Sequence, residues 1–171
     1  MTLQPYSKPR RALHWCFAVV IIWATVSGFV NALADLPEAV HDAIAFVNVS
    51  LTTLLIPLFG LRLYYALAHP APHDTLHGSQ AAHLLAQAGH LALYVSIAVV
   101  LLTGVLMMDR PISVFDLVVF PQPFDEPVLI EFFNLVHRYS CAALALLVAG
   151  HILAVVIHQL SGRNVLKRMV A

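Results

Sequence analysis

Apolar residues dominate four long segments of the chain, and polar residues gather between them. A helix that crosses a membrane needs about 20 mostly apolar residues. Segments of that kind cover residues 12–34, 40–68, 88–108 and 128–160, to within a few residues at each end. Pro57 lies inside the second segment and predicts a kink there. The pattern predicts an all-α fold, a bundle of four transmembrane helices.

The connections between these segments are polar or rich in proline. Residues 69–87 predict an inner loop, and its histidines are interpreted as solvated: His69, His73, His77 and His83. Residues 109–127 contain Pro111, Pro121, Pro123 and Pro127, a pattern typical of a loop against the outer surface rather than of a helix. Because no linker divides the chain, we expect residues 1–171 to form a single integral membrane domain.

Composition favours a membrane protein and excludes several other classes. Hydrophobic residues make up 60% of the 171 positions and charged residues only 11%, whereas a soluble domain carries about 25% charged residues. The 9 Lys and Arg residues balance 9 Asp and Glu residues. No basic excess therefore exists to bind nucleic acid. The 2 cysteines are too few for a disulfide framework.

Basic residues are concentrated on one side of the predicted bundle. Seven of the 9 lie there: Lys8, Arg10, Arg11, Arg62, Arg163, Lys167 and Arg168. Because loops rich in Lys and Arg stay in the cytoplasm, both termini are expected to be cytoplasmic. A cleaved signal peptide ending at Ala32-Leu33-Ala34 is the alternative, but the apolar run is too long for one and carries His14.

Two histidines of the fourth segment suggest the chemistry of the bundle. An ionisable residue inside a membrane span is costly and is by default a functional candidate. His137 and His151 are separated by 14 residues, which is about 21 Å and nearly four whole helical turns. Both imidazoles then project from one face, one near each membrane surface. That is the geometry of two metal centres, such as haems, stacked across a bilayer.

Each such histidine needs a partner on a facing helix at equal depth, because a single imidazole holds an electron-transferring haem poorly. The partner of His151 must lie near the inner end of another helix, and His14 fits. His158, one heptad beyond His151, could compete for this role. The position opposite His137 on the second segment is Asn48, which is not a histidine.

The 14-residue separation occurs twice more, each time between a histidine and a glycine. Gly28 follows His14 by 14 residues, and Gly104 follows His90 by 14 residues. Glycine lets a flat macrocycle approach a helix closely, which favours the haem hypothesis. Ordinary packing of small residues between membrane helices is the alternative explanation.

At this point the sequence resembles a family, the bacterial cytochrome b561 group, which is related to the b-type cytochrome subunits of nickel-iron hydrogenases and formate dehydrogenases. The resemblance covers almost the whole chain. It rests on Leu13-His14-Trp15, Arg62-Leu63, Ala88-Gly89-His90-Leu91-Ala92-Leu93-Tyr94, Pro111-Ile112-Ser113-Val114-Phe115, His137, His151 and Leu166-Lys167-Arg168-Met169.

The resemblance implies one or two b haems. It assigns His14 and His151 to the inner haem iron and His137 to the outer one. In the family the second outer ligand lies where this chain has Asn48, so His137 either bonds Asn48 across a site without haem or holds a second haem whose sixth position faces Asn48. The 14-residue glycine interval favours the second haem. His41, nearer the outer surface, is a substitute ligand only if the helix shifts locally.

The resemblance also implies electron transfer in a bacterial inner membrane, between the quinone pool and a periplasmic partner or a small acceptor such as superoxide. Arg62 suits the propionates of an inner haem, and Arg138 those of an outer haem. A quinone near the inner haem would find hydrogen bonds at His90, Gln87, Tyr94 or His158. The competing hypothesis is a non-redox four-helix protein, a transporter or metal permease subunit using the same histidines.

The charge asymmetry gives a direct test of orientation. A reporter that is active only in the cytoplasm should be active when fused to the C-terminus, because the basic residues hold that end inside. The same reporter inserted within residues 109–127 should be silent. A silent C-terminal fusion would contradict the proposed orientation.

Overall fold

The structure is a computed structural model, and it describes residues 6–69, 80–163 and 165–170. Within these ranges the elements are α1 (Lys8–Leu33), α2 (Glu38–Ala68), α3 (Gln80–Leu106), β1 (Ile112–Val114), β2 (Val118–Phe120), α4 (Pro127–Leu160) and the short α5 (Lys167–Val170). The first four α-helices of these ranges are long and apolar enough to cross a membrane. The predicted all-α bundle of four transmembrane helices is therefore confirmed.

The start of α3 is the main difference from the predicted boundaries. The helix begins at Gln80 rather than near residue 88, so the loop predicted for residues 80–87 is wrong, and His83 lies in a helix. The stretch consists almost wholly of Ala, Leu and Gln, which are strong helix formers. The prolines that suggested a loop end at Pro72. The prediction for His73 and His77 lies outside the described residues.

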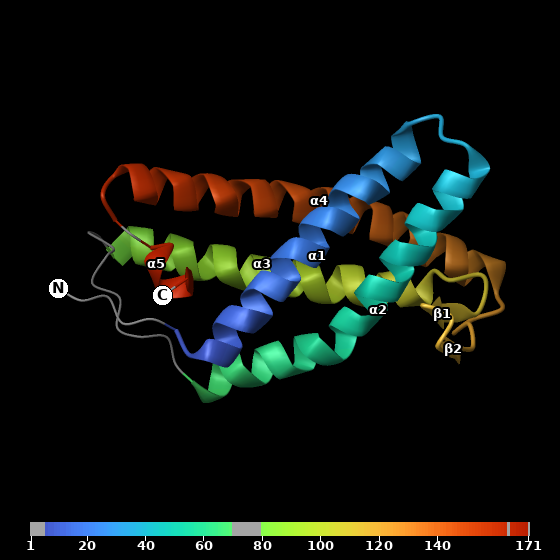
Figure 1. The fold of residues 1–171 in the computed structure, drawn as a ribbon, viewed down its shortest axis with the longest axis horizontal. Helices are drawn as coiled ribbons and strands as arrows, with labels where there is room; N and C mark the ends of the chain where they lie inside the picture. The colour runs from blue at the N-terminus through green and yellow to red at the C-terminus, as the bar shows by residue number, and fades with distance from the viewer. Residues whose placement is uncertain (1–5, 70–79, 164, 171) are drawn as a thin grey trace.

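The helices pack as two antiparallel pairs, α1 with α2 and α3 with α4, and α2 also contacts α3 (Figure 1). The turn between α1 and α2 and the β-hairpin lie at one end of the bundle. The first and last described segments meet at the other end, where the Tyr6 backbone N–H donates to the Arg168 carbonyl at 3.1 Å. Both ends of the chain thus lie on the same side of the bundle.

A small core joins the four helices at mid-height. Phe17 of α1 and Leu55 of α2 are each 2% exposed, and they cluster with Ile97, Leu101 and Leu144 from α3 and α4. Most other large apolar side chains of the helices face outward. Outward apolar residues are expected in a membrane protein, because lipid tails solvate them as well as a protein interior does.

The β-hairpin closes the end of the bundle next to α2. β1 pairs antiparallel with β2, and Phe115 and Asp116 in the turn have positive φ values of 50° and 56°. The fully buried Ser50 fixes this strained turn, since its Oγ donates to the Ser113 carbonyl at 3.3 Å and accepts from the Phe115 N–H at 3.0 Å. The expectation that this connection is not helical is confirmed, although the sequence pattern did not predict its strands.

Candidate haem site

Three histidines from three helices meet in the half of the bundle nearer the chain ends. The rings of His14 in α1 and His151 in α4 have centroids 6.4 Å apart. His90 of α3 lies beside this pair, with its ring centroid 5.6 Å from that of His151. The predicted pairing of His14 with His151 is therefore a contact between facing helices, and His90 joins it.

The spacing of the first two rings suits an iron atom between them. Two metal–imidazole bonds of about 2 Å, plus the radii of the two rings, place the ring centroids roughly 6 Å apart. His158, the competing ligand proposed from the sequence, lies two turns further toward the end of α4. The geometry therefore fits His14 and His151 as the axial pair.

Arg62 of α2 is the charged residue of this site. Its guanidinium carbon lies 5.2 Å from the ring centroid of Phe17 and 5.3 Å from that of Tyr94. The guanidinium is close enough to His14 and His151 to act on both electrostatically. Within the described part of the chain, its buried Nε and Nη1 atoms have no hydrogen-bond acceptor.

Such a buried cation needs an anionic partner, because unpaired buried donors and charges are costly. A haem carries two propionate carboxylates, and arginine binds carboxylates with two parallel hydrogen bonds. The two facing imidazoles and the unsatisfied guanidinium therefore fit a b haem at this position.

The half of α4 nearer the β-hairpin is arranged differently. His137 has a partner for each ring nitrogen, with Nδ1 3.1 Å from the Thr103 hydroxyl and Nε2 3.4 Å from the Cys141 sulfur. A Cβ at Gly104 would lie 3.1 Å from His137 Cε1. The space that Gly104 leaves is thus filled by the imidazole itself, which turns toward α3.

Asn48 pairs with α1 rather than with His137. The Ser27 hydroxyl donates to Asn48 Oδ1 at 2.9 Å, and a Cβ at Gly28 would lie 3.9 Å from Asn48 Nδ2. A hydrogen bond between Asn48 and His137, one of the two arrangements expected from the sequence, is therefore not found. The reason is the pairing of the helices, since α2 packs on α1 while α4 packs on α3.

Two other candidates lie at the surface. His41 is exposed in the first turn of α2, and its Nδ1 is 3.6 Å from an Asp42 carboxylate oxygen. Arg138 is also exposed, although it neighbours the half-buried His137. Neither side chain contributes to the buried polar cluster around His137.

Sequence reasoning missed three polar partners at this end of the bundle: Ser27, which bonds Asn48, and Thr103 and Cys141, which bond His137. Ser27 and Thr103 are 7% and 6% exposed, which is unusual for hydroxyl residues without a function in packing or binding. Each precedes one of the glycines that the 14-residue interval singled out. That adjacency is the signal by which the sequence could have identified them.

The fold and this site together define a membrane protein with two histidines on facing helices at a spacing that suits a haem. A family model described as prokaryotic cytochrome b561 matches residues 5–171, and the chain belongs to that family. It is therefore a multi-pass bacterial membrane protein, a b-type cytochrome of electron transfer. No curated protein matches the chain.

Replacing either axial candidate tests the ligand assignment. His14→Ala and His151→Ala should each remove the haem held by this pair, since one imidazole does not keep a low-spin b haem in place. Haem content per chain and the reduced-minus-oxidised spectrum measure the loss. His41→Ala, which removes an exposed histidine elsewhere in the protein, is the control and should leave both unchanged. Haem retention in both single variants would refute the assignment.

Proposed function

We propose that this cytochrome passes electrons between the quinone pool and a periplasmic partner or small acceptor, such as superoxide, through a haem held by His14 and His151. The observation that supports this most strongly is the 6.4 Å separation of the two rings, with the unsatisfied Arg62 beside them. Haem supplies the one-electron iron couple when it is bound. The protein supplies ligands, charge and burial.

The residues around the pair have distinct tasks. The two imidazoles come from different helices and resist displacement, because α1 and α4 are held by the common core that contains Phe17 and Leu144. Arg62 stabilises negative charge at the site and is itself held between two aromatic rings. Tyr94 is one of those rings, so α2 and α3 both position the guanidinium.

A quinone is the partner that the neighbouring polar residues suit best. His90 of α3 lies beside His151 of α4. Tyr94 is one turn further along α3, on the same face as His90. Both offer hydrogen bonds to a quinone oxygen near the ligand pair. Gln87 and His158 lie closer to the chain ends and would contact the quinone ring as it enters the site.

The bundle is oriented in the inner membrane with both chain ends in the cytoplasm. The contact between Tyr6 and Arg168 supports a common side for the two ends. The basic residues of α1 and α5 lie at that same end, as expected for a cytoplasmic face. The His14–His151 site then lies nearer the cytoplasm, and the hairpin faces the periplasm.

The arrangement around His137 supports one haem per chain, in contrast to the second haem that the glycine interval favoured. His137 would have to leave Thr103 or Cys141 to bind iron, and Asn48 would have to leave Ser27. Each step breaks a hydrogen bond in a bundle where lipid provides no replacement. The hydrogen bonds of His137 with Thr103 and Cys141 instead act as a structural contact between α3 and α4 and within α4.

Membership in the cytochrome family favours electron transfer over the alternative of a transporter or metal permease subunit. Among the described residues, no group of three or more His, Cys, Asp or Glu side chains is arranged to hold a metal ion. A purified protein without a Soret band would restore the alternative.

The quinone hypothesis is tested by the rate at which a quinol reduces the haem. His90→Ala should slow reduction about fivefold to tenfold, because it removes one hydrogen bond worth about 1 kcal/mol, while haem content stays the same. His83→Ala, one heptad earlier in α3, is the matched control. Stopped-flow absorbance measures both rates. Equal rates in the two variants would remove His90 from the quinone site, and no reduction of the wild-type haem would argue against quinol as the donor.

The number of haems is tested at His137. The wild-type protein should contain one haem per chain, and His137→Ala should keep it, because that haem depends on the other histidine pair. Pyridine haemochrome absorbance divided by protein concentration gives the ratio. Two haems per chain, with a spectral shift on adding carbon monoxide, would show instead that His137 holds a second haem open to small molecules.

A further inference from the structure

We propose that the groove between the start of α1 and α5 binds the head group of an anionic phospholipid. The groove has a volume of about 530 Å³ and is lined by Lys8, Arg11, Ala12, Trp15, Met169 and Val170. It lies at the end of the bundle where α5 meets the start of α1. The proposal concerns a surface that the haem site does not use.

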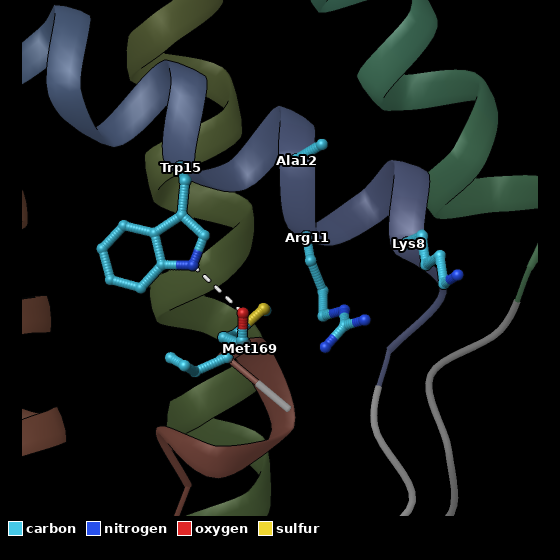
Figure 2. Close-up of a pocket in the computed structure, with 6 residues that line it drawn as sticks. Lys8, Arg11, Ala12, Trp15 and Met169 are labelled. Carbon is cyan, nitrogen blue, oxygen red and sulfur yellow. Dashed lines mark hydrogen bonds between the residues drawn. The ribbon is translucent and has the colours of Figure 1, made fainter.

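The groove combines positive charge with apolar surface on a single helix face. Lys8, Arg11 and Trp15 are spaced at i, i+3 and i+7, which places their side chains on one side of α1. Figure 2 shows Arg11 and Trp15 extending from α1 toward the segment that carries Met169. The Trp15 indole N–H donates to the Met169 carbonyl at 3.1 Å, which fixes α5 against α1 and keeps the groove in shape.

Arg10 and Arg168, two other cations at this end of the bundle, already interact with described residues. The Tyr6 ring lies between two guanidinium groups, with Arg10 at 4.8 Å and Arg168 at 5.2 Å from its centroid. Arg10 also donates to the His69 carbonyl. In contrast, Lys8 and Arg11 form no ion pair with any described residue.

Among the described residues, the distribution of acids leaves the groove without a counter-ion. Asp74 lies outside the described residues, and every other acidic residue lies at the opposite end, near the α1–α2 turn or the β-hairpin. Two cations at one groove therefore call for an anion from outside the chain. A phosphate diester meets this need better than a neutral quinone ring, because its full negative charge pairs with both side chains.

The position of the groove at the level of the lipid head groups favours a lipid over a soluble anion. The apolar run of α1 begins directly after Arg11, so Lys8 and Arg11 lie where the lipid head groups are. Trp15 is 42% exposed, and tryptophan favours this interface. Basic pockets on the cytoplasmic side of membrane helices are known to bind anionic head groups. Acyl chains would then pass over Trp15 and Met169.

Native mass spectrometry of the detergent-purified full chain tests the proposal. Phosphatidylglycerol should bind about tenfold or more tightly than phosphatidylcholine with the same acyl chains, since each cation near a head group favours the anionic lipid. Lys8→Gln/Arg11→Gln should abolish this preference. Lys8→Arg/Arg11→Lys, which keeps both charges, should retain it. Unchanged haem spectra would show that each variant is folded.

The matched control removes the same charge from the same end of the protein. Arg163→Gln/Lys167→Gln changes two cations that do not line the groove, and it should leave the preference intact. Equal binding of the two lipids by the wild-type protein, or equal losses in the two glutamine variants, would overturn the proposal. Displacement of phosphatidylglycerol by an equal concentration of inorganic phosphate would also overturn it, because the groove would then recognise a free anion.

Discussion

A polar or charged side chain inside a membrane bundle must find its partner there, because lipid offers neither hydrogen bonds nor counter-ions. Arg62 shows the consequence most clearly. It lies inside the bundle, two aromatic rings surround it, and two of its donor atoms lack acceptors among the described residues. A bound carboxylate removes that cost. In the proposed site, the haem and the fold are therefore coupled through this one side chain as well as through the two histidines.

The two ends of α4 show how the same residue type acquires different roles. His151 faces histidines of α1 and α3 across the bundle. His137 occupies the equivalent helix face near the other end, but its neighbours there are a threonine hydroxyl, a cysteine and Gly104, whose missing side chain leaves the room that the imidazole fills. A histidine ring with both nitrogens bonded to protein groups is held in place, whereas one that faces another imidazole is ready to share a metal.

Charge is distributed along the bundle as unevenly as the histidines are. One end carries the acids of the α1–α2 turn and the hairpin, and the other carries the basic residues of α1 and α5. The basic end also holds the two chain termini together through Tyr6, Arg10 and Arg168. The orientation and the lipid surface proposed above both rest on this single asymmetry.

Local properties of the sequence determined most of the fold. Hydrophobic length predicted the four spans, and the 14-residue interval on α4 predicted which face carries His137 and His151, since helical periodicity depends only on the chain itself. Depth along the helices predicted His14 as the partner of His151, with His158 as a competitor, and the rings of His14 and His151 lie 6.4 Å apart. The loop predicted over residues 80–87 failed because remote prolines and histidines outweighed the helix propensity of the intervening residues.

Only the tertiary structure decided which helices are neighbours. Equal depth suggested that Asn48 faces His137, but α2 packs on α1 and α4 on α3, so Asn48 bonds Ser27 and His137 bonds Thr103. The convergence of His90 and Arg62 on the ligand pair, and the groove beside Trp15, depend on the same choice of partners. Helix pairing in lipid is governed by close packing and interhelical hydrogen bonds, which join residues far apart in the sequence and leave little trace in its hydrophobic pattern.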